Sequence, residues 1–374
     1  VGKVKGFEIE KLPEFQTPGM ARHHIAVIGG DGIGPEVTGA ACEVLEELQS
    51  VFPELKLEFS EFDWGSGYYL KEGRMMPEDG LDLLKSFDAI LFGSAGSPEV
   101  PDHITLWGLR LEICQHFDQY ANVRPARLLP GIKGPLRDAG PEDLDWIIVR
   151  ENTEGEYSGA GGRVHPGLSQ EVGVDVSLFT RSGIERIMRF SFDLAASRPK
   201  KQLTLVTKSN AQRHGMVLWD EVFAELEPQY PDIRTDRMLV DAMTTRMVLQ
   251  PGSLDTLVAT NLHADILSDL AAALSGSLGI GPTANLNPER KFPSMFEPIH
   301  GSAFDLVGQR TANPLGAFWS CVLMLEHLGE SGAAVHLMKS IEKVTAQKIH
   351  LPMDLGGTAN TEEVTVAVCS MLRD

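Results

Sequence analysis

Short apolar runs alternate with longer amphipathic stretches along most of this chain. The short runs are typical of buried strands, and they cover residues 24–29, 89–94, 145–150, 202–208, 237–242 and 256–261. Between some of them, residues 38–52 and 181–197 carry apolar positions at helical spacing. This alternation predicts an α/β fold with much parallel sheet.

One segment breaks the alternation. Residues 154–181 are first rich in glycine and then alternate apolar and polar positions. A period of two is typical of a strand rather than of a helix. We therefore predict a β-arm at about residues 152–180.

Polar residues stand at the ends of several predicted strands, namely Arg150, Lys208, Asp241 and Asn261. In open α/β sheets, ligands bind beyond the carboxyl ends of the strands. The four positions are therefore candidates for a functional site.

The first predicted strand runs into a glycine-rich turn. Gly30, Gly32 and Gly34 have the spacing G-x-G-x-G, whereas a dinucleotide fingerprint needs G-x-G-x-x-G. Pro35 suits the first turn of a helix, where its missing N–H is not needed. The sequence therefore predicts a strand, a tight turn and a helix, and the binding site of any cofactor has to be sought elsewhere.

Composition narrows the class of protein. The chain has 374 residues, of which 43% are hydrophobic, and this is enough for two domains with full cores. The net charge of −19 disfavours nucleic acid as a partner, but a local arginine cluster can still hold an anionic substrate. No apolar run is long enough to span a bilayer, so we expect no membrane partner.

The cysteines and the N-terminal residues add two expectations. Four cysteines lie far apart and form no C-x-x-C pair, which indicates a reducing compartment and a cytoplasmic protein without structural zinc. Residues 1–19 have no clear period and precede Met20. We expect them to be vector-derived, with the native start at Met20, or to be a natural disordered extension.

Three carboxylates are candidates for a metal site. Asp265 and Asp269 are four residues apart at the start of a predicted helix, which puts both on one face. Asp241 ends a predicted strand. Carboxylates without thiolate partners suit a hard ion such as Mg²⁺ or Mn²⁺. The competing interpretation is a solvated helix face.

Four further side chains could bind or transform a small acid. Arg124 and Arg150 each accompany a predicted ordered segment, and arginine forks hold carboxylates bidentately. Lys208 stands at a strand end, where a lysine near a metal can act as a base. Tyr157 could donate a proton. Taken alone, either arginine is better explained as an ordinary surface residue, and Lys208 and Tyr157 are weak signals by themselves.

The motifs become specific when they are taken together. The following blocks occur in this order: GGDGIGPEV, YANVRP, RENTEGEYSG, TKSN, VDAMTTRMV, NLHADILSD, NPERKFPSMFEPIHGSAFD and TANPLGAFW. Together they resemble the metal-dependent β-decarboxylating dehydrogenases, the family of isocitrate, isopropylmalate, D-malate and tartrate dehydrogenases. The resemblance covers nearly everything from Met20 onward. HITLWGL at residues 103–109, with FDQYANVRP after it, is most similar to the tartrate/D-malate branch.

The resemblance implies an isopropylmalate/isocitrate dehydrogenase-like fold, not a Rossmann fold, with two α/β domains around a central cleft. The first, cofactor-side domain would join residues 20–119 to residues 276–374. The second would comprise residues 120–275 and carry the β-arm.

The resemblance also implies a nicotinamide cofactor. It would lie along His300, Gly301, Ser302 and Ala303, with its adenine side near Asn313. Asp305 matches the position that distinguishes the two nicotinamide cofactors, and a carboxylate there can bind ribose hydroxyls and repel a 2′-phosphate. We therefore predict NAD rather than NADP.

The same resemblance assigns chemical roles. Arg124, Arg150 and Asn210 would bind a small hydroxy dicarboxylate, Lys208 would be the base, and Tyr157 would protonate the enol left by loss of CO₂. The metal would be Mg²⁺ or Mn²⁺ on Asp241, Asp265 and Asp269, and K⁺ is a further candidate cofactor. In this family the lysine and one aspartate reach in from the neighbouring subunit, so we expect a homodimer with shared active sites, clasped by the β-arm.

One position departs from the family pattern. Family members usually carry a substrate-binding arginine ten residues before the arginine of N-x-R-P, and this chain has Cys114 there. Arg110 lies one helical turn earlier and could reach the same carboxylate or reshape the pocket. A guanidinium at this position argues against an isopropyl substituent on the substrate. The alternatives to a tartrate or D-malate enzyme are an isopropylmalate or other 3-substituted malate dehydrogenase, and a regulatory or binding paralogue.

Overall fold

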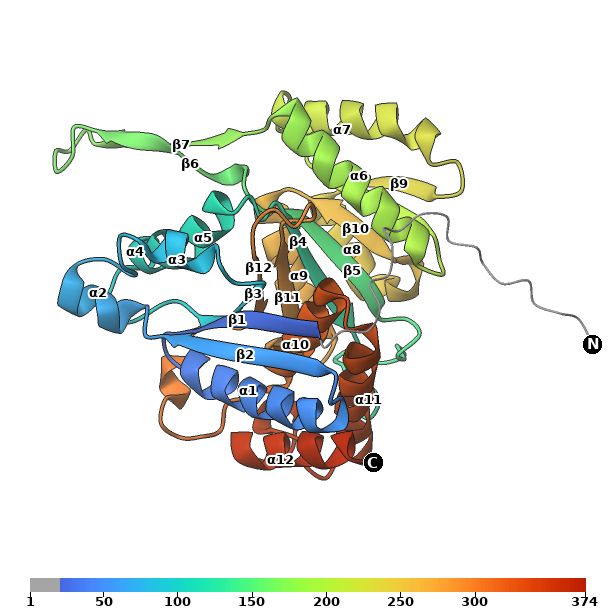
Figure 1. The fold of residues 1–374 in the computed structure, drawn as a ribbon. Helices are drawn as coiled ribbons and strands as arrows, with labels where there is room; N and C mark the ends of the chain where they lie inside the picture. The colour runs from blue at the N-terminus through green and yellow to red at the C-terminus, as the bar shows by residue number, and fades with distance from the viewer. Residues whose placement is uncertain (1–20) are drawn as a thin grey trace, which may run out of the picture.

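The computed structural model describes residues 21–374, and the expectation for residues 1–19 lies outside them. A mixed ten-stranded sheet runs through the molecule (Figure 1). In spatial order its strands are β2 (Leu55–Phe62), β1 (Ala21–Gly30), β3 (Ala89–Ser94), β12 (Ser294–Pro298), β11 (Pro282–Leu286), β4 (Ala121–Arg127), β5 (Asp145–Glu151), β10 (Thr256–Ala259), β8 (Gln202–Thr207) and β9 (Arg234–Leu239).

The sheet consists of two parallel blocks joined by an antiparallel centre. Strands β2, β1, β3 and β12 are parallel neighbours, and so are β5, β10, β8 and β9. Strands β11 and β4 pair antiparallel with their neighbours between the two blocks. The predicted α/β fold with much parallel sheet is confirmed.

Helices cover both blocks. The helices are α1 (Gly34–Val51), α2 (Ser66–Glu72), α3 (Gly80–Leu84), α4 (Asp102–Thr105), α5 (Leu111–His116), α6 (Arg181–Ser197), α7 (Gly215–Leu226), α8 (Val240–Leu249), α9 (Asn261–Leu274), α10 (Leu315–Leu328), α11 (Ser331–Gln347) and α12 (Thr361–Leu372). A π-helical turn, η1 (Leu106–Arg110), joins α4 to α5. Helices α1 and α10 pack on the first block, whereas α6 and α7 pack on the second.

Five of the six predicted strands are present with small changes at their ends, but the prediction for residues 237–242 is wrong at its carboxyl end. Strand β9 ends at Leu239, and Asp241 lies in the first turn of α8. Strand β9 is at the edge of the sheet, and its partner β8 ends at Thr207, opposite Leu239. Beyond that point no strand is available to continue the ladder.

The glycine-rich turn after β1 packs against a distant loop. Gly32 has a φ of +61°, and a Cβ built on it would lie 1.9 Å from the carbonyl oxygen of Ser302. The amide of Ile33 donates to the same oxygen at 2.9 Å. The predicted strand, turn and helix are confirmed, and the turn supports the loop at residues 300–303.

The predicted β-arm is a two-stranded hairpin, β6 (Gly155–Val164) and β7 (Val172–Leu178). It extends away from the body of the molecule (Figure 1). Apolar side chains on it are exposed, namely Val164, Leu168, Val172, Val174, Val176 and Leu178. A single chain therefore leaves an apolar surface on the arm unburied.

Three general features complete the fold. The expected division at residues 120 and 275 falls between β11 and β4, where the sheet continues without a break, and it stays a prediction. All four cysteines are free thiols. None of the helices between residues 21 and 374 combines the length and apolarity needed to cross a membrane.

Candidate active site

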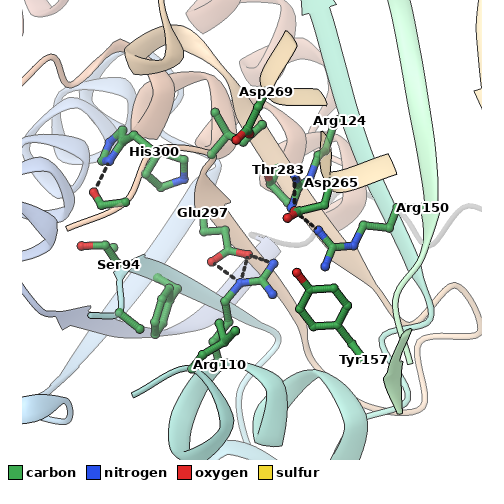
Figure 2. A pocket seen from close by; sticks show the side chains of 17 residues that line it. Ser94, Arg110, Arg124, Arg150, Tyr157, Asp265, Asp269, Thr283, Glu297 and His300 are labelled. Atoms are coloured by element: carbon green, nitrogen blue, oxygen red, sulfur yellow. Dashed lines mark hydrogen bonds and ion pairs between the residues drawn. The ribbon is translucent and has the colours of Figure 1, made fainter. Parts of the chain in front are cut away.

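A cavity of about 220 Å³ lies at the antiparallel centre that joins the two parallel blocks. Its polar lining comes from both blocks and from the base of the arm (Figure 2). The polar side chains are those of Ser94, Arg110, Arg124, Arg150, Tyr157, Asp265, Asp269, Thr283, Glu297 and His300. Sequence segments almost 200 residues apart thus contribute to one site, as residues 94 and 283 illustrate.

Two buried arginines converge on one carboxylate. Arg124, on β4, donates from Nη1 to Asp265 at 3.1 Å and to Ser268 at 2.6 Å. Arg150, on β5, donates to the same Asp265 oxygen and, at 2.5 Å, to Asn261. The Arg150 side chain is only 2% exposed. The sheet and α9 therefore fix both guanidinium groups before any ligand arrives.

The electrostatics of this cluster follow from burial and mutual repulsion. Burial, and then the charge of Arg150, lower the pKa of Arg124 to about 10. Burial alone would raise the pKa of Asp265, but Arg150 and Arg124 outweigh it and hold that pKa below its usual value. Asp265 is therefore ionised at neutral pH, and an anion near the arginines would relieve their repulsion.

Asp265 and Asp269 lie on the pocket side of α9, as their spacing predicts. Thr260 caps the amino end of this helix through its side chain. Among residues 21–374, neither Asp269 nor the second oxygen of Asp265 has a hydrogen-bond donor. Burial and the nearby Asp265 raise the pKa of Asp269. Unpartnered carboxylate oxygens of this kind fit a hard divalent cation.

Tyr157 is positioned by the arm and by α5. Its backbone carbonyl accepts a hydrogen bond from Gln115 Nε2 at 3.1 Å. Its ring lies 5.3 Å from the Arg150 guanidinium. Burial, followed by the charge of Asp265, raises the pKa of Tyr157, so its hydroxyl keeps its proton at neutral pH.

Arg110 lines the pocket, whereas Cys114 does not. Arg110 Nε donates to Glu297 at 2.8 Å, and its Nη2 lies 2.6 Å from the same carboxylate. Burial alone would lower the pKa of Arg110, but Glu297 outweighs it and keeps the guanidinium charged. Cys114 is fully buried behind this wall, and burial raises its pKa to about 11. The thiol therefore does not replace the missing arginine in the pocket.

Lys208, Asn210 and Asp241 lie outside the pocket of their own chain. They follow β8 and β9, farther along the same edge of the sheet. Lys208 Nζ donates to Asp241 at 2.5 Å, and this bond lowers the pKa of Asp241. Within residues 21–374 no three potential metal ligands come together. The three predicted metal aspartates are thus not assembled by one chain.

The predicted cofactor residues begin at the rim of the pocket. His300 and Gly301 line it, while Ser302, Ala303 and Asp305 continue along the next loop. His300 Nε2 is buried without a partner among the described residues, and burial lowers the pKa of this imidazole. A buried neutral imidazole with a free nitrogen fits a neutral polar ligand such as a nicotinamide amide.

Asn313 is already engaged in the structure. Its Nδ2 donates to Asp354 at 2.9 Å, and its Oδ1 accepts from the amide of Leu315 at 3.0 Å. Asp305, by contrast, is exposed and its carboxylate has no partner among residues 21–374. Asp305 is therefore free to bind a ligand, whereas Asn313 mainly holds the start of α10.

Sequence reasoning did not single out Glu297, Ser268 and Thr283. Glu297 lies inside a quoted block, NPERKFPSMFEPIHGSAFD, but no spacing connects it with Arg110. The two are 187 positions apart and meet through η1 and β12. The only available signal was that a buried arginine needs a carboxylate partner.

The fold and the pocket define an α/β protein in which three arginines and three carboxylates line one cavity between two parallel sheet blocks. Residues 24–368 match the family model described as isocitrate/isopropylmalate dehydrogenase, and the chain belongs to this family.

Similar proteins include dehydrogenases that also decarboxylate. A protein of Agrobacterium vitis named "Probable tartrate dehydrogenase/decarboxylase" is 64% identical over 353 residues, covering 94% of this chain and 98% of that protein. The D-malate dehydrogenase [decarboxylating] of Escherichia coli (strain K12) is 46% identical over 360 residues, covering 94% and 99%. The crystal structure of isocitrate dehydrogenase from Methylococcus capsulatus superposes with a TM-score of 0.85 at 32% identity, covering 94% of this chain and 100% of that one.

Proposed function

We propose that this chain is an NAD- and divalent-metal-dependent dehydrogenase that oxidises and decarboxylates a small (2R)-hydroxy dicarboxylic acid such as tartrate or D-malate. The relatives at 46–64% identity carry names of this kind. The guanidinium of Arg110 in the pocket disfavours the alternative with an isopropyl substituent, because an apolar branch would meet a charged group.

The charge balance of the pocket carries this proposal. Three arginines and three carboxylates line the cavity, so their formal charges cancel. A divalent cation would add two positive charges, and a dicarboxylate would bring two negative ones. The Lys208–Asp241 pair, which is also neutral, would not disturb this balance. The pocket therefore suits a divalent cation and a dianion bound together.

Each of the predicted site residues has a separate role in substrate binding, proton transfer or metal binding. Arg124 and Arg150 would bind the second carboxylate of the substrate, and Tyr157 would give its proton to the enol carbon after decarboxylation. Lys208 of a second copy would accept the hydroxyl proton. A divalent cation on Asp265 and Asp269, with Asp241 of that copy, would stabilise negative charge on the substrate oxygens, and NAD would accept the hydride.

A homodimer is part of the proposal. Asp241 is 66% exposed, and Lys208 does not line the pocket of its own chain. Ile266, next to Asp265 on α9, is an exposed apolar residue, as are several residues of the arm. Burying these surfaces against a second copy would bring the Lys208–Asp241 pair of one chain toward the pocket of the other.

The choice of NAD rests on Asp305. Its free, exposed carboxylate can accept hydrogen bonds from ribose hydroxyls and would repel a 2′-phosphate. K⁺ stays a candidate cofactor, so the activity assay should contain it.

The deciding experiment measures NADH formation with Mn²⁺ and K⁺ on D-malate, the tartrates, isocitrate and 3-isopropylmalate, with CO₂ followed in parallel. We expect turnover of D-malate or a tartrate with release of CO₂, and little with NADP. Turnover of 3-isopropylmalate alone would replace the proposed substrate. A dimer that binds NAD and metal but turns over none of the acids would indicate a binding paralogue.

A further inference from the structure

A buried asparagine connects two arginines of the pocket. Asn285, on β11, is fully buried and lies directly opposite Asn122 of β4 in the sheet. Arg124 is two residues beyond Asn122, on the same face of β4, and it lines the cavity (Figure 2). Asn285 itself does not line the cavity. It can therefore affect a ligand only through the side chains that it holds.

The side-chain oxygen of Asn285 accepts from three donors. Asn122 Nδ2 lies 2.7 Å from it, Asn152 Nδ2 3.1 Å and Arg110 Nη2 3.4 Å. The oxygen of Asn122 in turn accepts from Arg124 Nε at 2.9 Å. Arg110 and Arg124 are thus both connected to one oxygen atom, directly in the first case and through Asn122 in the second.

The side-chain nitrogen of Asn285 faces acceptors. It donates to Glu297 Oε1 at 2.8 Å and to the backbone carbonyl of Met295 at 3.3 Å. Glu297 also accepts from Arg110 Nε at 2.8 Å, so Asn285 holds the carboxylate that fixes this arginine. A reversed amide would place its oxygen against two acceptors and its nitrogen against three donors. The orientation of Asn285 is therefore fixed by its neighbours.

We propose that Asn285 is a positioning residue for the substrate: it holds the Arg124 guanidinium and the Arg110–Glu297 pair in the arrangement that binds the second carboxylate. The arginines are then ordered when the chain folds, and a ligand does not have to order them on binding. This inference rests on the proposed function, because it assumes that Arg124 holds a carboxylate of the substrate.

The proposed role concerns the acid rather than the metal or the cofactor. Among residues 21–374, no hydrogen bond joins the Asn285 side chain to Asp265, Asp269 or His300. Loss of Asn285 should therefore affect the binding of the acid much more than the binding of Mn²⁺ or NAD. A general loss of structure would affect all three.

The test compares the wild type with Asn285→Leu, which has the branched shape of the amide but no hydrogen-bonding atoms. We expect the KM of the acid that is oxidised to rise by roughly 10- to 100-fold, because small displacements of a binding group have effects of this size. The KM of NAD and the Mn²⁺ requirement should change much less. Calorimetry on the Mn²⁺-loaded protein should show the same rise in the Kd of succinate, a dicarboxylate without a hydroxyl group.

The matched control is Asn287→Leu, two residues farther along the chain. Asn287 is also buried. Its side chain bonds to backbone groups of Asp118, Lys291 and Phe292, none of which lines the pocket. This variant should lose stability without raising the KM of the acid. An equal rise in both variants, or no rise in Asn285→Leu, overturns the inference.

A second variant, Asn285→Asp, keeps the shape of the side chain and serves if the leucine variant does not fold. In alkaline solution its carboxylate would lie against that of Glu297 and could not donate to it. In more acidic solution, one proton shared between the two carboxylates would restore a donor and the original charge. We expect the Kd of succinate, relative to the wild type, to be raised at about pH 8 and to recover toward pH 6. Wild-type affinity at both pH values contradicts the inference.

Succinate binding also separates this inference from the proposed function. Succinate has no hydroxyl group to oxidise, so its Kd can be measured whether or not the wild type turns over any acid. If no acid is oxidised, the proposed function fails. A Kd of succinate that is at least about 10-fold higher in Asn285→Leu than in Asn287→Leu then still supports the role of Asn285. Equal Kd values, or a wild type that does not bind succinate, reject it.

Discussion

The pocket and the Lys208–Asp241 pair lie along the same edge of the sheet, but they are built differently. In the pocket, Arg150 is 2% exposed and held by Asp265 and Asn261. At the other end of the edge, Asp241 is 66% exposed and Lys208 27%, and their charged groups are held by each other. The fold of one chain thus organises the first region, whereas the second region has no buried partner to orient it.

This difference has a physical reason. A buried charge must be paired and hydrogen-bonded, so the pocket can exist only in one arrangement. Exposed charges are stabilised by water and can exchange partners at little cost. In the proposed dimer, Asp241 could therefore exchange Lys208 for another ligand without the cost of breaking a buried ion pair.

The largest effect is expected in a complementation experiment, which tests whether the pocket and the Lys208–Asp241 pair of one active site come from different chains. Lys208→Met removes the proposed base from the exposed pair, and Tyr157→Phe removes the proposed proton donor from the pocket. Each homodimer should lose at least about 100-fold in kcat, because each substitution removes an acid–base group. Mixed dimers, purified with two different affinity tags, should recover about half of the wild-type activity, since one of their two sites contains both intact regions.

The control is a Lys208→Met dimer purified with the same two tags, which should stay inactive. If the mixed dimers are as inactive as their parents, both regions act within one chain, and the shared site is refuted.

Substitutions in the two regions should also differ in their effect on the free energy of unfolding. Arg150→Met leaves Asp265 with one arginine and Asn261 with an unpaired oxygen, so it should lower the free energy of unfolding by about 3 kcal/mol. Lys208→Met should change it by less than about 1 kcal/mol, because the pair is exposed. Urea denaturation of both variants measures the difference. If both variants lost the same free energy of unfolding, the Lys208–Asp241 pair would stabilise the fold as much as Arg150 does.

The affinity for the metal should depend on aspartates from both regions. Asp269→Asn and Asp241→Asn should each raise the Mn²⁺ concentration for half-maximal activity by roughly 10- to 100-fold, because each removes a carboxylate oxygen and its charge. Chelation with EDTA should abolish turnover, and added Mn²⁺ should restore it. A normal Mn²⁺ requirement in Asp241→Asn would exclude that residue from the metal site, although it would leave Asp265 and Asp269 in place.

The smallest expected effect is a pH dependence on the pocket side. Burial raises the pKa of Glu151, next to Arg150, from 4.5 to about 7, despite its hydrogen bonds to Thr153 and Glu154. The folded protein therefore holds this proton more tightly than the unfolded chain, and stability should fall as pH rises through this window. Between pH 5 and pH 6 the loss should be about 1 kcal/mol.

Glu151→Gln should remove this slope, which urea denaturation at several pH values can measure. Lys208 lowers the pKa of Asp241, so its contribution is present above its ordinary pKa of 3.8 and is lost only in more acidic solution. Asp241→Asn should therefore leave the slope between pH 5 and pH 7 unchanged. A slope that persists in Glu151→Gln would have to come from another group.

Local patterns sufficed for much of this molecule. Residues 181–197 were predicted as a helix and form α6 with the same bounds, because their apolar face repeats at helical spacing. The hairpin of the arm followed from alternation and glycine content. The end of β9 could not be predicted in this way, because it depends on where its neighbour β8 stops.

The sequence by itself determined the family, the α/β architecture and the placement of Asp265 and Asp269 on one face of a helix, since these depend on ordered motifs and on local periodicity. Only the tertiary structure decided that Glu297 neutralises Arg110, that Cys114 is buried behind the pocket, and that Lys208 and Asp241 lie outside it. The reason is that burial and charge pairing depend on which segments, far apart in the sequence, come into contact in the folded chain. A local sequence pattern does not contain this information.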